Sequence, residues 1–316
     1  MSYRVQALSE DVLAMSEELD SLGGGSDARV GKLDSVVVVQ PGGDGAVSVD
    51  GDCDVLVRDS RAGEMPVTRT VKRFKVSRAM PAGDRSGVVE EVGGSIFDWL
   101  WAGFSCVCVS YGQSATGKTF MMFGGEETTL QTQPLCSRVL RLLFDAIRRS
   151  DEPALYTAAI SSFEIADGKV RDLLDVSDGT GSSSKEVEVI SVQAPSLHVA
   201  ESILYTARCN SVNWEQGAAL TSEQRSKPNQ AHGFVRITLH HETEGQFTTL
   251  HFVDLVGSQS LSLQRISAQV LLSPLSRRRL AKRRIVNQQL LSFSRVISEL
   301  ARLSKDGAGS PKVGTH

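Results

Sequence analysis

The first regular pattern along the chain is a seam of apolar residues near its beginning. The seam follows a 4-3-4-3 spacing at Leu8, Val12, Met15, Leu19 and Leu22. Acidic residues occupy positions between them, so the pattern predicts an amphipathic helix within residues 1–24, ended by Gly-Gly-Gly-Ser at 23–26. Two heptads are typical both of a short helix that caps a domain and of the end of a coiled coil, and both interpretations stay open.

Continuous apolar runs and alternating patterns predict the strands of a sheet. Residues 36–39 are four valines in a row, and the Gly, Asp and Val of residues 42–70 indicate short strands and turns. A hairpin is expected to turn near Glu244 and Gly245, with its second strand ending at Asp254. We expect buried strands over residues 36–39 and 105–110, further strands over 158–165, 234–240 and 247–253, and a short element over 170–174.

Helical spacing recurs in three further stretches. Residues 88–101 predict a helix that Gly103 ends, and a second helix carries Leu135, Val139, Leu142, Leu143 and Ile147. A long helix is expected over residues 276–303, with apolar positions at Ile285, Leu290, Phe293, Val296, Ile297 and Leu300. Residues 177–186 are rich in Ser and Gly and predict a surface loop.

Composition and charge exclude several classes of protein. The 316 residues are 41% hydrophobic and 22% charged, which is typical of a globular protein. A net charge of -3 gives no reason to expect nucleic acid as a partner. Ser9, Glu10 and Asp11 interrupt any signal peptide, and no apolar run is long enough for membrane insertion, so we expect a cytoplasmic protein.

The five cysteines give no sign of a disulfide framework or a zinc site. Their number is odd, their spacing is irregular, and no two are separated by only two residues. Cys106 and Cys108 lie in an apolar run and are expected in the core.

A phosphate-binding loop follows the strand predicted over residues 105–110. Residues 112–119 match the pattern G-x-x-x-x-G-K-[ST] and consist of Gly112, Gln113, Ser114, Ala115, Thr116, Gly117, Lys118 and Thr119. The glycines let backbone amides approach phosphates, and the following helix presents its positive end. Lys118 would bind the β and γ phosphates, and Thr119 would offer a hydroxyl to magnesium.

Asp254 is the second expected support for magnesium, because an aspartate at the end of a strand has this role in P-loop nucleotidases. It begins the motif Asp-Leu-Val-Gly, whose Gly257 amide could sense the γ-phosphate. A guanine-binding protein would need Asn-Lys-x-Asp downstream, and the sequence has none there. We therefore expect ATP.

Four motifs in the sequence resemble the motor domain of kinesins. Residues 111–120, YGQSATGKTF, resemble the family's Y-G-Q-T-x-x-G-K-T-[FY], and residues 252–258, FVDLVGS, resemble its switch II. Residues 286–300 are similar to its switch II helix. Phe163-Glu164-Ile165, with Val-Arg-Asp-Leu-Leu at 170–174, is similar to its [LF]-E-I-Y-N-E-x-[VI]-x-D-L-L.

The resemblance implies an α/β P-loop fold in which a central mixed β-sheet lies between two layers of helices. It implies ATP and magnesium as cofactors, microtubules as the partner and the cytoskeleton as the location. Residues 36–316 would form the motor-like domain, residues 25–35 a linker, and residues 1–24 a possible coiled-coil neck, as in C-terminal-motor kinesins. Such a neck would allow a homodimer.

The chain departs from the family where ATP would be cleaved. The family's switch I reads N-x-x-S-S-R-S-H, and alignment on His232 places Asn229 and Gln230 where the second serine and the arginine stand. The glutamate that pairs with that arginine falls on Gln259. Two neutral amides interact about half as strongly as a charge-assisted pair. We count Asn229, Gln230, Gly257 and Gln259 as the candidate catalytic residues.

Three further features bear on nucleotide and track binding. The family's adenine-side R-x-R-P is reduced to Val-Val-Gln-Pro, which leaves Pro41 and predicts weaker nucleotide affinity. A basic run, expected to face acidic tubulin, consists of Arg277, Arg278, Arg279, Lys282, Arg283 and Arg284. A charge run is also typical of a solvated helix face. The sequence ends at His316, before the family's last tubulin-contacting segment, so the domain is expected to be truncated.

Two functions follow from these observations. The first is an ATP-hydrolysing motor that moves along microtubules. The second is a hydrolysis-impaired module that binds nucleotide or microtubules without motility. Asn229, Gln230 and Gln259 are the positions that separate them.

Overall fold

The computed structural model describes residues 36–39, 47–58, 71–81, 85–113, 116–125, 133–166, 169–175, 189–211, 231–242, 246–257, 281 and 284–298. The chain divides into two compact units, one formed by residues 85–257 and the other by residues 1–84 with 258–316. The predicted heptad helix, the linker and the Ser/Gly-rich loop over residues 177–186 lie outside the described residues. The domain boundaries stay predictions.

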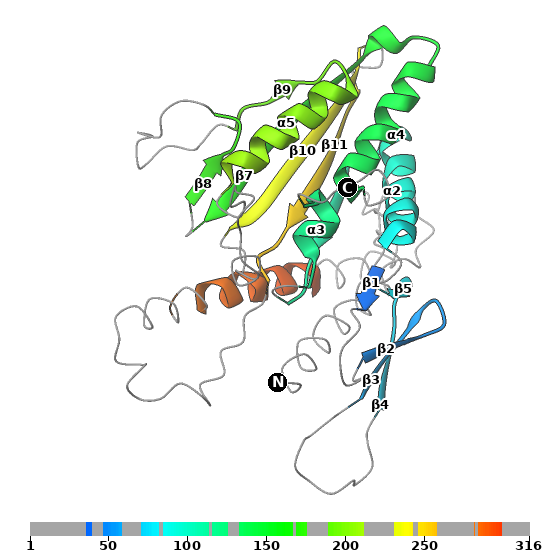
Figure 1. The fold of residues 1–316 in the computed structure, drawn as a ribbon, viewed down its shortest axis with the longest axis vertical. Coiled ribbons are helices and arrows are strands. Elements are labelled where there is room, and N and C mark those ends of the chain that lie inside the picture. The colour runs from blue at the N-terminus through cyan, green and yellow to red at the C-terminus, as the bar shows by residue number, and fades with distance from the viewer. Residues whose placement is uncertain are drawn as a thin grey trace, which may run out of the picture. The chain divides into compact units, whose positions relative to one another are not determined.

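A mixed sheet organises the unit of residues 85–257 (Figure 1). Its strands follow the order β6-β11-β10-β7-β8, and β9 pairs with β7. The pair β6 and β11 is parallel, whereas the other pairs are antiparallel. The bounds are Cys106–Ser110 for β6, Tyr156–Ala166 for β7, Lys169–Asp172 for β8, Val192–Gln193 for β9, His232–His241 for β10 and Gln246–Asp254 for β11.

Four helices share one core cluster with this sheet. They are α2 (Arg85–Trp101), α3 (Lys118–Phe123), α4 (Leu135–Arg149) and α5 (Leu197–Asn210), and the 3-10 turn η2 (Pro153–Leu155) precedes β7. Leu143 of α4, Ile160 of β7 and Ile237 of β10 are fully buried in this cluster. Burial of apolar surface, worth about 25 cal/mol per Å², is the dominant favourable term in folding.

Local sequence explains where several of these helices begin and end. Ser196 precedes α5, and its Oγ accepts a hydrogen bond from the amide of Val199, which caps the helix. Arg148 and Arg149 occupy the last turn of α4, where a positive charge is favourable. Gly103 follows α2 with a φ of 90°, a backbone conformation that favours glycine.

The other unit contains two small sheets and a helix. Strand β1 (Val36–Val39) pairs in parallel with β5 (Arg78–Pro81), and β2 (Val47–Asp50), β3 (Asp54–Arg58) and β4 (Val71–Lys75) form an antiparallel sheet. Val55, Val57, Val76 and Ala79 form the core cluster of this unit. A helix covers residues 284–298.

Most expected elements are confirmed, and two expectations of burial are wrong. Val36, Val37 and Val38 are half-buried rather than buried, because β1 has a single described neighbour, β5. Strand β6 lies at the edge of the described sheet, so Cys106 and Cys108 are half-buried at the margin of the core, and Val107 is 67% exposed. Helix α5 and strands β4, β5 and β9 were not predicted from the sequence.

Candidate functional site

The loop between β6 and α3 carries the backbone geometry expected of a phosphate-binding loop. Gly112 has a φ of 147° and Gly117 a φ of 86°, and other residues rarely adopt these values. Thr116 Oγ1 donates a hydrogen bond of 2.9 Å to the carbonyl of Gln113, and Lys118 Nζ donates to the same oxygen. The side chain of Lys118 is therefore folded back over the loop to which it belongs.

Asp254 joins this loop to the end of β11. Its carboxylate is 2% exposed and accepts a hydrogen bond from Thr119 Oγ1. Ser110, the last residue of β6, donates a second hydrogen bond of 2.8 Å to Asp254 Oδ1. The parallel register places Ser110 opposite Asp254, so two neighbouring strand ends hold one carboxylate. Ser110 was missed by sequence reasoning, because its contact with Asp254 depends on the parallel pairing of β6 with β11.

Burial shifts the pKa values of the two charged residues of the site in opposite directions. Burial raises the pKa of Asp254 above its ordinary value of 3.8, against the hydrogen bonds from Thr119 and Ser110 and the charge of Lys118. Burial also lowers the pKa of Lys118 from 10.5, while the charge of Asp254 opposes the change. Both charges are thus incompletely compensated by the protein alone, which is the electrostatic state of a site built for a charged ligand.

The residues after Asp254 are fixed to the neighbouring strands. The amide of Leu255 donates to the carbonyl of Ser110 at 3.3 Å, and the amide of Val256 donates to His232 Nδ1 at 3.1 Å. His232 begins β10 and is 7% exposed. The segment that leads from Asp254 to the buried Gly257 is therefore tied to both β6 and β10.

Two arginines hold the far end of α3. Arg85 of α2 donates to the carbonyl of Phe120 at 2.7 Å, and its guanidinium lies 3.7 Å from the centre of the Phe120 ring. Arg208 of α5 donates to the carbonyl of Phe123 at 3.0 Å. These contacts satisfy carbonyls at the end of the short helix and fix its direction.

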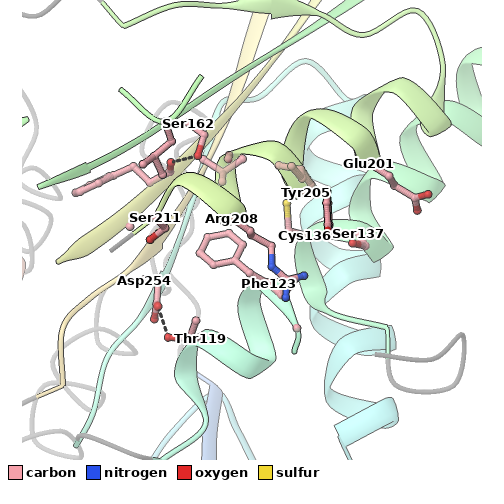
Figure 2. Close-up of a pocket in the computed structure, with 17 residues that line it drawn as sticks. Thr119, Phe123, Cys136, Ser137, Ser162, Glu201, Tyr205, Arg208, Ser211 and Asp254 are labelled. Atoms are coloured by element: carbon pink, nitrogen blue, oxygen red, sulfur yellow. Dashed lines mark hydrogen bonds between the residues drawn. The ribbon is translucent and has the colours of Figure 1, made fainter. Parts of the chain in front are cut away.

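A mostly apolar cavity of about 240 Å³ adjoins this site (Figure 2). Asp254 and Thr119 lie at one end of it, and residues of α3, α4, α5, β7 and β10, including Phe123, Cys136 and Leu204, line much of the remainder. Lys118 and Gly112 are not among its lining residues. Ligand pockets usually span about 300–1,000 Å³. This cavity adjoins the phosphate loop, but it is too small to hold a nucleotide.

Magnesium is the metal that the residues present would fit. Thr119 Oγ1 and the Asp254 carboxylate are hard oxygen donors that already lie in contact, and the carboxylate is buried with a charge that the protein compensates incompletely. Among the described residues, no group of three His, Cys, Asp or Glu side chains could hold a metal ion by itself. Such a sparse donor set is typical of magnesium that is bound together with phosphates.

Several predicted site residues lie outside the described residues. They are Pro41, Ser114, Ala115, Asn229, Gln230, Gln259, Arg277, Arg278, Arg279, Lys282 and Arg283. Of the basic run, Arg284 is described and is exposed at the start of the helix over residues 284–298. The structure thus brings together Gly112, Gln113, Thr116, Gly117, Lys118, Thr119 and Asp254. The roles of all the candidate residues stay predictions.

Comparison with known proteins identifies the family. The model of the kinesin motor domain matches residues 56–308. The chain is 26% identical over 251 residues to Kinesin-like protein KIN-14J of Oryza sativa subsp. japonica, which covers 75% of this chain and 28% of that protein. It is 27% identical over 267 residues to human Kinesin-like protein KIFC1, covering 77% and 38% of the two chains. Kinesin-like protein KIFC2 of Mus musculus is 29% identical over 212 residues, covering 63% and 25%.

The matched part spans only about a quarter to two fifths of the length of these relatives. None of the described helices has the length and apolar character needed to cross a membrane. The family match covers well over half of the chain, and the mixed sheet with its helices agrees with the expected α/β P-loop fold. The chain therefore belongs to the kinesin motor domain family.

Proposed function

We propose that this chain is a microtubule-binding motor domain that binds ATP with magnesium and cleaves it. The observation that carries the proposal is the contact between Thr119 and Asp254, which joins the phosphate-binding loop to the end of β11. This contact unites the two magnesium-supporting groups of P-loop nucleotidases in one place. The location of the protein would be the cytoskeleton in the cytoplasm.

Each residue of the cluster has a distinct role in this proposal. Lys118 would leave the Gln113 carbonyl and bind the terminal phosphates, since their charge is a stronger partner than a neutral oxygen. Thr119 and Asp254 would hold magnesium, which neutralises charge on the phosphates when it is bound. Gly257 would report the γ-phosphate, because its segment is fixed at Leu255 to β6 and at Val256 to β10, the two neighbours of β11.

The helix over residues 284–298 supports binding to microtubules. Its exposed residues combine the positive charges of Arg284 and Arg295 with the apolar side chains of Ile285, Leu291 and Val296, which are 48%, 52% and 56% exposed. A surface of this kind fits an acidic partner that also offers apolar contacts. If replacing the basic run, Arg277 to Arg279 with Lys282 to Arg284, by alanine leaves co-sedimentation with microtubules unchanged, this part of the proposal fails.

A second function is favoured by the residues of the two switches. Gln230 and Gln259 stand where the family has an arginine and a glutamate, and Asn229 stands in place of a serine. A gate that must close to orient the attacking water is sensitive to the loss of a charge-assisted pair. The alternative is a module that binds nucleotide and microtubules and cleaves ATP slowly or not at all.

One experiment separates the two functions. Binding of MgATP is measured first by calorimetric titration, and phosphate release is then followed with and without microtubules, each beside Lys118→Ala. Release that microtubules stimulate in the wild-type chain alone supports the motor. Binding without release above the Lys118→Ala level supports the static module. A folded wild-type chain that binds no MgATP contradicts both.

A further inference from the structure

The short helix α3 carries Lys118 and Thr119 in its first turn, yet its own sequence does little to fix its direction. It spans only the six residues Lys118–Phe123, and helices shorter than about 12 residues are marginal by themselves. Gly117 precedes it and gives no side-chain cap, and Met122 is the one buried residue of the six, all of which the structure describes. Contacts with other elements must therefore set the direction of α3.

The contact at the beginning of α3 is not sufficient for this purpose. Thr119 Oγ1 donates a hydrogen bond to the carboxylate of Asp254 there. The same two groups are the proposed ligands of magnesium, so their hydrogen bond is not available to hold the helix once the metal is bound. In the loaded site, the direction of α3 then depends on the contacts at its other end.

Two arginines from two different helices make those contacts, and we call Arg85 and Arg208 the arginine clamp. Arg85, the first residue of α2, donates from Nη2 to the carbonyl of Phe120 at 2.7 Å, and its guanidinium lies 3.7 Å from the centre of the Phe120 ring. Arg208, in the last turn of α5, donates to the carbonyl of Phe123 at 3.0 Å (Figure 2). The clamp therefore holds two carbonyls that are nearly one helical turn apart.

The position of Arg85 is unfavourable for stability. Its Nε and Nη1 atoms are buried, and no described residue accepts a hydrogen bond from either of them. Burial also lowers the pKa of Arg85, because the guanidinium loses part of its hydration. A buried donor without a partner costs free energy on folding. A role in the function of the site explains such a residue better than a contribution to stability does.

We propose that Arg85, together with Arg208, is a positioning residue that keeps Thr119 in place at the candidate magnesium site. Six helical residues are about 9 Å long, so a tilt of about 10° at the clamp would move the first turn by more than about 1 Å. Magnesium tolerates little departure from octahedral geometry, so a shift of this size would weaken its binding. The inference rests on the proposed function and deepens it, since the clamp would make nucleotide binding depend on magnesium.

The test measures how strongly magnesium supports the binding of ADP by the full chain. ADP is titrated calorimetrically with magnesium and with EDTA, for wild type, Arg85→Met, Arg208→Met and the control Arg148→Met. Arg148 is also in the last turn of a helix, and its ion pair is with Asp145 of the same helix. We expect magnesium to strengthen ADP binding about tenfold or more in wild type and control, and less than about threefold in the two clamp variants.

Thermal melts without nucleotide separate positioning from a purely structural role. Because Arg85→Met removes two buried donors that lack partners, its melting temperature should not fall below that of wild type. A structural role would instead lower the melting temperature and weaken ADP binding equally with magnesium and with EDTA, which would overturn the inference. Should Arg208→Met fail to fold, Arg85→Met decides alone.

Thr119→Val shows whether the clamp acts through Thr119. In this background, Arg85→Met should leave the affinity for ADP in magnesium unchanged, because the group that the clamp positions is already absent. A further loss of affinity would mean that Arg85 acts on another group and would contradict the inference. A wild-type chain that binds no ADP, or binds it equally with EDTA, contradicts the proposed function itself. A magnesium effect that stays intact in both clamp variants contradicts the clamp only.

Discussion

Thr119 Oγ1 donates a hydrogen bond to the carboxylate of Asp254, and the two residues are 135 positions apart in the sequence. The contact is possible because β6 and β11 are parallel neighbours, so that the loop after β6 and the end of β11 meet at the same edge of the sheet. Ser110 completes the arrangement from the last position of β6. The sheet therefore builds the site, and helices α2 and α5 hold α3 against it through Arg85 and Arg208.

Lys118→Met is expected to weaken nucleotide binding strongly without loss of stability. Burial lowers the pKa of Lys118, because keeping its ammonium group charged inside the protein costs free energy. Methionine has a similar length and no charge to bury. We expect MgATP affinity to fall at least about 100-fold, or about 2.7 kcal/mol, and the melting temperature without nucleotide to be unchanged or higher. Calorimetry and thermal melts measure the two, with the exposed Lys169→Met as control. Undiminished affinity would contradict the role of Lys118.

Asp254→Asn is expected to stabilise the chain in the absence of magnesium and nucleotide. Burial raises the pKa of Asp254, so the folded state binds this proton more tightly than the unfolded state. The free energy of unfolding therefore falls as pH rises from about 3.8 through the raised pKa, and it stays reduced at neutral pH. Asparagine does not titrate, so the variant should melt higher than wild type at pH 7, and the difference should shrink toward pH 4.

Thermal melts across this pH range, with the exposed Asp151→Asn as control, check the prediction. A lower melting temperature for Asp254→Asn at every pH would mean that the hydrogen bonds from Thr119 and Ser110 outweigh the cost of burial. Magnesium should raise the melting temperature of the wild-type chain with ADP, because a ligand that binds only the folded state stabilises it. The same addition should have little effect on Asp254→Asn.

Thr119→Val is expected to remove the dependence of nucleotide binding on magnesium, because valine keeps the shape of threonine and lacks the hydroxyl. Thr119→Ser retains the hydroxyl and serves as the matched control. We expect EDTA to weaken ADP binding by wild type and Thr119→Ser about tenfold or more, and to change binding by Thr119→Val much less. Equal sensitivity of all three chains to EDTA would show that Thr119 does not hold the metal.

The thiols give a check on the fold that is independent of nucleotide. Burial raises the pKa of Cys108 to about 12 and raises that of Cys136 further, so neither forms the reactive thiolate near neutral pH. Cys53 is exposed. We expect a maleimide at pH 7.5 to modify Cys53 rapidly, and Cys136, which is 1% exposed, only after unfolding. Mass spectrometry of peptides identifies the labelled residues, and rapid labelling of Cys136 would contradict the packing of α4.

The sequence identified residues that meet at the candidate site better than it predicted their surroundings. Lys118, Thr119 and Asp254 belong to motifs whose residues are set by the ligand, so they could be recognised one by one. Ser110 could not, because its role depends on the parallel pairing of β6 with β11, which spans more than a hundred residues. Burial of residues 105–110 was overestimated for a related reason: an apolar run predicts a strand and does not say whether the strand lies at an edge.

Helix α5 was missed because its apolar pattern is weak and includes polar residues of low helix propensity, such as Ser202 and Thr206. Tertiary packing stabilises this helix, because Ala200, Ile203 and Ala207 are buried in the main core cluster. The contacts of the buried Glu164 were likewise invisible in the motif that contains it. Its partners Arg171 and Ser211 come from a strand and a helix end that only the folded chain brings together.

Gln230 and Gln259 offer the sharpest test of which proposed function is correct. By resemblance to the family, an arginine and a glutamate at these positions would form the ion pair that closes the two switches, and here both are neutral. If this loss limits hydrolysis, Gln230→Arg with Gln259→Glu should raise microtubule-stimulated phosphate release about tenfold or more, because a charge-assisted bond replaces a neutral one. Either substitution alone introduces an unpaired charge and should give no gain.

Nucleotide affinity measured on all four chains separates an effect on binding from one on cleavage. A wild-type rate that microtubules stimulate and that the double variant does not exceed would show that the two glutamines already close the gate. Rates of both chains no higher than that of Lys118→Ala would show instead that the lost ion pair is not what limits hydrolysis.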